Sequence, residues 1–241
     1  MKIRILDVQD IYNEVADVFV DVIKLKTNPI LGLATGSTPI GVYDELIKRN
    51  KEGKVSFKNV TSFNLDEYVG LDGNHDQSYR YFMNTHLFNH VDIDKNKTFV
   101  PLGIGDIKDN AKKYDLMIDA AGGIDLQILG IGSDGHIAFN EPGTPFDALT
   151  HEAELTEMTI KDNARFFESI GDVPTRAITM GLASIMKARK IVLIALGKNK
   201  VDAITRLLNG EVSLDLPVSV LNTHEDVTIY LDKETFGYLE K

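Results

Sequence analysis

Three ionisable residues lie close together in segment 130–143, which otherwise holds mainly glycines and apolar residues: Asp134, His136 and Glu141. Carboxylates beside a histidine raise its pKa, fix its tautomer and allow it to move protons near neutral pH. We therefore interpret the three residues as an acid–base group, with a structural histidine that is satisfied within the core as the alternative. A metal could use the same residue types, but their spacing matches no standard ligand motif.

The start of this segment, Gly130 to Gly135, matches the G-x-G-x-x-G pattern of dinucleotide-binding loops and follows an apolar stretch. That pattern has to open a long helix, but Pro142 and Gly143 leave room for only a very short one. No clear strand ending in an acidic residue follows at about 20 residues, where a ribose-binding acid would stand. We therefore exclude a nicotinamide dinucleotide as the ligand.

A second segment, residues 32–39, has the character of a phosphate-binding loop. Gly36, Ser37 and Thr38 follow an apolar stretch, and Pro39 stands where the first residue of a helix is expected. With Thr38 as N-cap, free backbone amides and the helix dipole would attract an anion such as phosphate. The Gly-Lys-Ser/Thr ending of a Walker A loop is missing. The same residues also fit an ordinary capped turn between a strand and a helix.

Further charged residues stand at predicted strand ends or in a polar region. Asp66, next to Glu67, could serve as a general base or metal ligand, or as a helix cap or solvated turn. Lys200 falls in the first turn of a predicted helix, where the dipole disfavours a cation, so a nearby anion would explain its position. Arg165 could close onto a phosphate from a mobile segment. For Lys200 and Arg165 the alternative is an ordinary surface position.

The elements that position these residues alternate between strands and helices along the whole chain. This alternation predicts an α/β fold: a Rossmann-like, doubly wound, mostly parallel sheet with helices on both faces. We expect one domain, residues 1–241, with a lid-like excursion at 143–174, where the sequence is more polar and less periodic. Ligands of such sheets bind beyond the carboxyl ends of the strands. The predicted strands are 2–6, 30–33, 60–65, 98–101, 126–130, 177–180, 191–196 and 227–231, and the predicted helices are 10–25, 39–50, 79–88, 110–121 and 199–208.

Composition excludes several classes of partner. The net charge of −10 argues against nucleic acid, because backbone binding needs a broad basic surface, but it allows a small phosphorylated ligand. No run approaches the roughly 20 apolar residues of a membrane helix, so we expect no membrane partner. The chain has no cysteine, which excludes disulfides and thiolate chemistry. With Asp7 too early for a signal peptide, we expect a cytoplasmic location.

Three motifs resemble the glucosamine-6-phosphate deaminase family, and the third is the most specific. They are Leu-Ala-Thr-Gly-Ser-Thr-Pro at 33–39, Phe-Asn-Leu-Asp-Glu-Tyr at 63–68 and Ser-Asp-Gly-His-Ile-Ala-Phe-Asn-Glu-Pro at 133–142. The resemblance spans essentially the whole chain. It implies that an aminosugar phosphate, glucosamine 6-phosphate, reacts with water to give fructose 6-phosphate and ammonia, with neither a metal nor an organic cofactor. We class this activity as a hydrolase of amino sugar catabolism.

The resemblance also implies roles for individual residues. His136 would move a proton at the ring oxygen and open the pyranose, while Asp134 and Glu141 orient it. Asp66 would act as the general base that moves a proton between C2 and C1. The phosphate group would be held by residues of three separate segments: Gly36, Ser37, Thr38, Arg165 and Lys200.

One departure from the family bears on regulation. Its larger hexameric members are allosteric and carry basic residues shortly after the Asn-Glu-Pro motif, whereas 143–155 has neither Lys nor Arg here. We therefore expect hyperbolic kinetics and a monomer or small homo-oligomer. The alternatives that we keep are a galactosamine-6-phosphate deaminase, a 6-phosphogluconolactonase and a non-catalytic sugar-phosphate sensor. The lactonase motif runs into a Ser-Leu-Phe-Pro-like sequence, unlike Ala138 to Pro142. The joint presence of the four acid–base residues speaks against the sensor: Asp66, Asp134, His136 and Glu141.

Overall fold

The computed structural model describes residues 1–239, apart from the side chain of Phe166; residues 240 and 241 of the predicted domain lie outside this range. Within it, a seven-stranded sheet has the order β1-β10-β9-β6-β2-β3-β5, and every neighbouring pair is parallel. The predicted α/β fold with a mostly parallel sheet is therefore confirmed. The strands are β1 Lys2–Leu6, β2 Ile30–Leu33, β3 Thr61–Asn64, β5 Thr98–Phe99, β6 Leu126–Leu129, β9 Ile191–Ala195 and β10 Val227–Asp232.

The chain reverses its direction of travel across the sheet between β2 and β6. From β2 it continues outward to β3 and β5, whereas from β6 it continues the other way to β9 and β10. The loops that leave the carboxyl ends of β2 and β6 therefore diverge, and a crevice opens between them. In open α/β sheets this switch point is where ligands bind.

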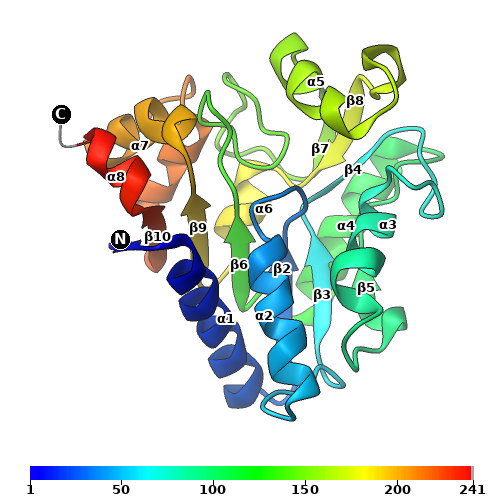
Figure 1. The fold of residues 1–241 in the computed structure, drawn as a ribbon. Coiled ribbons are helices and arrows are strands. Elements are labelled where there is room, and N and C mark those ends of the chain that lie inside the picture. Colours follow the sequence, from blue (N-terminus) through cyan, green and yellow to red (C-terminus); the bar gives the residue numbers. More distant parts are fainter. Residues whose placement is uncertain (240–241) are drawn as a thin grey trace.

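Helices cover the sheet on both faces, with α1 and α2 in the foreground of Figure 1 and α4 and α6 fainter behind. The long helix α1, Val8–Leu25, turns a stripe of apolar residues at helical spacing toward the core, including Ile11, Val15 and Phe19. In α2, Ile40–Lys51, the buried Tyr43 donates to the carbonyl of Ala34 at 2.6 Å and so fixes the loop after β2. The other α-helices are α3 Tyr79–Met83, α4 Ile107–Ala121, α5 Glu157–Asn163, α6 Leu182–Met186, α7 Val201–Leu208 and α8 Lys233–Leu239.

A second, antiparallel sheet stands beyond the carboxyl ends of the main strands and has the order β4-β8-β7. Its strands are β4 Asp66–Tyr68, β7 His151–Glu154 and β8 Arg176–Thr179. The strand predicted at 60–65 thus ends earlier, and the chain crosses from β3 in the main sheet to β4 in the small one. The strand predicted at 177–180 exists as β8, but it pairs with β4 and β7 and not with the parallel sheet.

The region 143–174 contains β7, α5 and two short 3-10 helices, Ala164–Phe166 and Ile170–Asp172. Through β7 and β8 it is joined to β4, and Figure 1 places α5 above the carboxyl ends of the central strands. The helix predicted at 79–88 is α-helical only to Met83 and continues as a π-helix, Asn84–Phe88. Among the described residues, no helix is both long and apolar enough to cross a membrane.

Candidate active site

The loop after β6 presents His136 by a tight return of its own backbone. The amide of Gly132 donates to the carbonyl of His136 at 2.8 Å, and Gly135 has a φ of +86°, which a side chain would strain. Gly132 lies directly under the histidine, because a Cβ there would stand 2.3 Å from the imidazole. The glycines that resemble a dinucleotide fingerprint therefore serve to bring one side chain close to the backbone.

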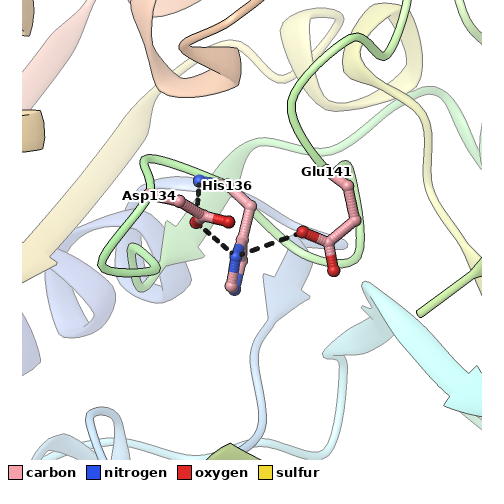
Figure 2. Close-up of side chains that lie close together, drawn as sticks. All are labelled: Asp134, His136 and Glu141. Atoms are coloured by element: carbon pink, nitrogen blue, oxygen red, sulfur yellow. Dashed lines mark hydrogen bonds and ion pairs between the residues drawn. The ribbon is translucent and has the colours of Figure 1, made fainter. Parts of the chain in front are cut away.

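The imidazole of His136 lies between two carboxylates (Figure 2). Its Nδ1 is 2.7 Å from Oδ1 of Asp134 and 3.7 Å from Oε2 of Glu141, both as ion-pair contacts. Nδ1 has no hydrogen-bond partner among the described residues, because the Asp134 oxygen lies off the direction of a ring N–H and the Glu141 oxygen is too distant. The backbone amide of His136 also donates to Asp134, at 3.1 Å. The structure thus brings together the three residues that the sequence picked out, with the histidine between the two acids.

The charges within the cluster lower the pKa of Asp134. Burial alone would raise its pKa, but the contact with His136 and the positive charge of that ring outweigh this and bring the pKa to about 2. Asp134 is therefore ionised throughout the neutral range. One ligand atom from each of the three residues lies within 4.8 Å of the others, so the set is compact enough for a metal ion. Both carboxylates, however, lie against Nδ1 itself, which favours an ion pair with a protonated ring over a metal site. The absence of a metal stays a prediction.

Asp66 and Glu67 face opposite ways on β4, as successive strand residues do. Asp66 is 6% exposed and lines the cavity described below, and burial together with the neighbouring Glu67 charge raises its pKa to about 8. Glu67 accepts from the amides of Tyr79 and Arg80 at 2.9 and 3.0 Å and so caps α3. Burial raises the pKa of Glu67 to about 7, although these hydrogen bonds lower it. One acid of the pair is a cap, and the other is free for chemistry.

A cavity of about 480 Å³ occupies the crevice at the switch point. The loop after β2 forms one wall, the loop after β6 another, and α5 with the residues after β9 closes the remaining side. Asp134 and Glu141 do not line it and stand behind His136. The predicted site residues on its wall are Gly36, Ser37, Thr38, Asp66, His136, Arg165 and Lys200.

Two cations gather at one part of this cavity. Burial and the charge of Arg165 both lower the pKa of Lys200, while Asp162 and Asp134 act in the opposite direction. Lys200 ends a 3-10 helix and directly precedes α7, so it lies one step before the helical turn where it was expected. Arg165 lies just beyond α5, on the 3-10 helix that follows.

The hydroxyl loop lines the same cavity, with one difference from the prediction. The helix begins at Ile40 and Pro39 is its N-cap, so Thr38 is not the N-cap that we expected. Pro39 has helical angles (φ −81°, ψ −9°), but the first residue of the helix is Ile40, one residue later than we expected. Gly36 has a φ of +81°, which glycine adopts without strain.

Several residues of the site gave no signal in the sequence. Thr159 of α5 lines the cavity and donates to Glu141 at 2.5 Å. Tyr79 and Phe139 line it too and stack with ring centroids 6.1 Å apart, and Tyr12 enters from α1. Ala138 has a φ of +52°, a rare conformation for a side chain and one that collects at functional sites. An isolated positive φ cannot be read from an alanine in a sequence.

Gly132→Ala should impair the site more than the fold. The new methyl group would stand 2.3 Å from the imidazole, so we expect the ring to shift and turnover to fall on the order of tenfold or more, with an overpacking cost of roughly 1–3 kcal/mol. Steady-state kinetics and thermal unfolding measure the two effects. Gly237→Ala is the matched control, because its Cβ would enter open space. Unchanged turnover in Gly132→Ala would show that the ring position is not critical.

The fold and the site define an α/β protein whose cavity joins an acid–base group to two cations, and comparison with known proteins gives the family. Residues 7–230 match the family described as glucosamine-6-phosphate isomerases/6-phosphogluconolactonase, and the chain belongs to this family. It is 54% identical over 219 residues to a glucosamine-6-phosphate deaminase of Clostridium perfringens, covering 90% of both chains. It is 51% identical over 240 residues to that of Mycoplasma mycoides, covering 99% of this chain and 98% of the other.

A solved structure gives the same picture. A monomeric glucosamine-6-phosphate deaminase superposes with a TM-score of 0.97 at 41% identity and covers 99% of this chain and 100% of its own. The 6-phosphogluconolactonase of Thermotoga maritima shares the fold at a TM-score of 0.76 but only 23% identity, over 96% of this chain and 98% of its own. The predicted class of hydrolase was wrong: the relatives matched over nearly the whole chain are deaminases, and the family description names isomerases.

Proposed function

We propose that this chain is a glucosamine-6-phosphate deaminase, which converts glucosamine 6-phosphate and water into fructose 6-phosphate and ammonia. The observation that carries the proposal is one cavity at the switch point that joins an imidazole flanked by two acids, a buried carboxylate and two cations. An aldose–ketose isomerisation needs an acid–base group at the ring oxygen, a base at carbon and an anchor for the phosphate. The identity to deaminases over nearly the whole chain supports the same activity.

The reaction begins with ring opening at His136. The imidazolium gives a proton to the ring oxygen as the bond from C1 to that oxygen breaks, and the C1 hydroxyl gives its proton to water, which yields the open-chain aldehyde. Asp134, ionised because its pKa is about 2, and Glu141 stabilise the charged ring that makes this donation. A positioned acid–base group of this kind contributes typically ~10²–10⁴-fold.

Asp66 then acts at carbon. Its carboxylate removes the proton from C2 while the C1 oxygen takes a proton from water, which gives an enolamine, and the same carboxyl returns a proton to C1. The resulting C2 iminium adds water and expels ammonia, leaving the C2 ketone of fructose 6-phosphate. Desolvation makes Asp66 a stronger base than an ordinary carboxylate, since its pKa of about 8 lies near that of a working general base.

The phosphate is placed at the cationic part of the cavity. Lys200 and Arg165 supply charge, while the hydroxyls of Ser37 and Thr38 and the amides around Gly36 supply hydrogen bonds. Because Arg165 belongs to region 143–174, we propose that this region acts as a lid on the single domain, held to β4 through β8. Binding of the phosphate holds C2 close to Asp66, and this fixed geometry lowers the activation free energy of the proton transfer.

We further propose a cytoplasmic enzyme that is a monomer or a small homo-oligomer with hyperbolic kinetics. The similar solved structure is of a monomeric deaminase, and the segment 143–155 lacks the basic residues expected of an effector site. Sigmoidal kinetics relieved by N-acetylglucosamine 6-phosphate would contradict this part of the proposal.

A coupled assay of ammonia release tests the function directly. We expect turnover of glucosamine 6-phosphate, with a hyperbolic dependence on its concentration. Galactosamine 6-phosphate and 6-phosphogluconolactone are the comparison substrates, the second followed by acid release. Faster ammonia release from galactosamine 6-phosphate would reassign the epimer, and hydrolysis of the lactone without ammonia from either aminosugar would overturn the proposal. Binding without turnover of any of the three would indicate a sensor.

A further inference from the structure

One carboxylate oxygen of Glu141 accepts hydrogen bonds, and among the described residues the other has no hydrogen-bond partner. Its Oε1 accepts from the hydroxyl of Thr159 at 2.5 Å and from that of Thr156 at 3.3 Å. Its Oε2 is buried with no hydrogen-bond partner in the described part of the chain, and lies 3.7 Å from Nδ1 of His136. The carboxylate therefore connects α5 to His136: one oxygen is hydrogen-bonded to Thr159 of α5, and the other faces the imidazole.

The two threonines form one turn at the start of α5. Thr156 is the N-cap, and its hydroxyl oxygen accepts from the amide of Thr159 at 3.2 Å. The Thr159 side chain is buried, with the residue 3% exposed, and it lines the cavity. A hydroxyl can donate only one hydrogen bond, and a carboxylate is the stronger acceptor. The Thr159 hydroxyl therefore donates to Glu141, at 2.5 Å.

The same helix reaches the phosphate end of the cavity. Thr159, Asp162 and Asn163 follow at helical spacing and all line the cavity, and Arg165 comes directly after α5. The carboxylate behind His136 and the cation assigned to the phosphate are therefore connected through α5 and the 3-10 helix that follows it. When Arg165 engages a phosphate, α5 is fixed, and with it the oxygen that Thr159 holds.

We infer that Thr159 is a positioning residue for the acid–base group: its hydroxyl holds one oxygen of Glu141 so that the other faces the His136 imidazole. Without that bond the carboxylate can rotate about its side-chain torsions and leave the imidazole, so the charged ring loses one of its two partners. The inference rests on the proposed function in taking His136 as the acid–base group, but the contact itself can be tested without substrate.

The test is the titration of His136 followed by NMR in the substrate-free protein, with its signal assigned from a His136→Asn variant. Thr159→Val keeps the shape of the side chain and removes the hydroxyl, so we expect the titration midpoint of His136 to fall by roughly half a pH unit or more. Thr159→Ser restores the donor and should restore the midpoint. Thr205→Val is the control, because that hydroxyl bonds only within α7, at 2.7 Å to the carbonyl of Val201.

The expected change must pass through Glu141 and not through other charges. The charged groups around this imidazole from other elements and from its own loop are Asp134, Asp66, Lys200, Asp162 and Arg165, and the Thr159 variants leave all of them in place. Glu141→Gln should lower the midpoint by itself, and adding Thr159→Val to it should change nothing further.

Several results would overturn the inference. An unchanged His136 midpoint in a folded Thr159→Val protein would reduce Thr159 to a structural role, as would equal effects in the presence and absence of Glu141. Should Thr159→Val prove unstable in thermal unfolding, the smaller Thr159→Ala removes the same hydroxyl without a steric conflict and is read in the same way. A protein that lacked deaminase activity but showed the midpoint change would refute the proposed function and leave the positioning contact intact.

Discussion

Asp66→Asn is expected to abolish proton exchange at C2 while leaving substrate binding in place. The amide has nearly the shape of the carboxylate but cannot take a proton from carbon, so turnover should fall by roughly 10²–10⁴-fold. Exchange is measured by NMR as the loss of the C2 proton signal in deuterated water, and binding by calorimetry. Exchange that persisted at the original rate would remove Asp66 from its assigned role.

The same substitution should raise stability, and the gain should depend on pH. The folded protein holds the proton of Asp66 up to about pH 8, whereas the unfolded chain releases it near 3.8. Between these values the unfolded chain binds fewer protons, so stability falls as the pH rises, and at pH 7 the penalty is at most roughly 4 kcal/mol. Asp66→Asn removes this penalty. We therefore expect the melting temperature to rise at pH 7 to 8 and to change little at pH 4.

Asp92 is a control carboxylate whose pKa is shifted in the opposite direction to that of Asp66. Burial raises the pKa of Asp92, but hydrogen bonds from Ser56, Phe57 and Asn50 outweigh it and hold the pKa below its usual value. Asp92→Asn should therefore destabilise the protein at neutral pH and have less effect in acid. Equal responses of the two variants to pH would show that Asp66 is not buried in a way that favours its neutral form.

Asp66, a destabilising acid at the start of β4, can be predicted from the sequence only in part. The sequence singled out Asp66 because it follows an apolar run, and in the structure it does follow a strand of the main sheet. Its burial depends on β4 leaving the main sheet to pair with β8, and short polar strands such as β7 carry no period that would reveal this. Glu67, by contrast, was expected to point away from Asp66, and it proved to be a helix cap.

The acid–base residues of the loop after β6 were easier to predict from the sequence than the residue that positions them. Asp134, His136 and Glu141 are close in the chain, so any compact loop brings them together, and β6 with its glycines fixed where that loop begins. Thr159 comes from a different element and bonds Glu141 across 18 positions of sequence, with no motif to mark it. Propensity and periodicity describe elements one at a time, whereas this contact depends on how α5 packs over the sheet.

His136→Asn is the second variant with a large expected effect. The asparagine amide can still contact Asp134 from near the position of Nδ1, but it cannot carry a proton to the ring oxygen of the sugar. Ring opening should become limiting, and ammonia release should fall by roughly 10²–10⁴-fold. The reduced substrate analogue 2-amino-2-deoxyglucitol 6-phosphate has no ring to open, so its inhibition constant should stay within a few fold of the parent value.

This pairing of turnover with the open-chain analogue separates chemistry from binding. If His136 chiefly held the sugar, both quantities would deteriorate together, because uniform binding is lost equally from ground state and transition state. If it chiefly supported the loop, the melting temperature would drop as well, which thermal unfolding would detect. His90→Asn is the control, since that residue is exposed and its Nε2 lies 2.8 Å from the carbonyl of Thr85. Loss of turnover alone, with analogue binding and melting temperature retained, is the outcome that places the proton transfer at His136, with Asp134 and Glu141 stabilising the charged ring that makes it.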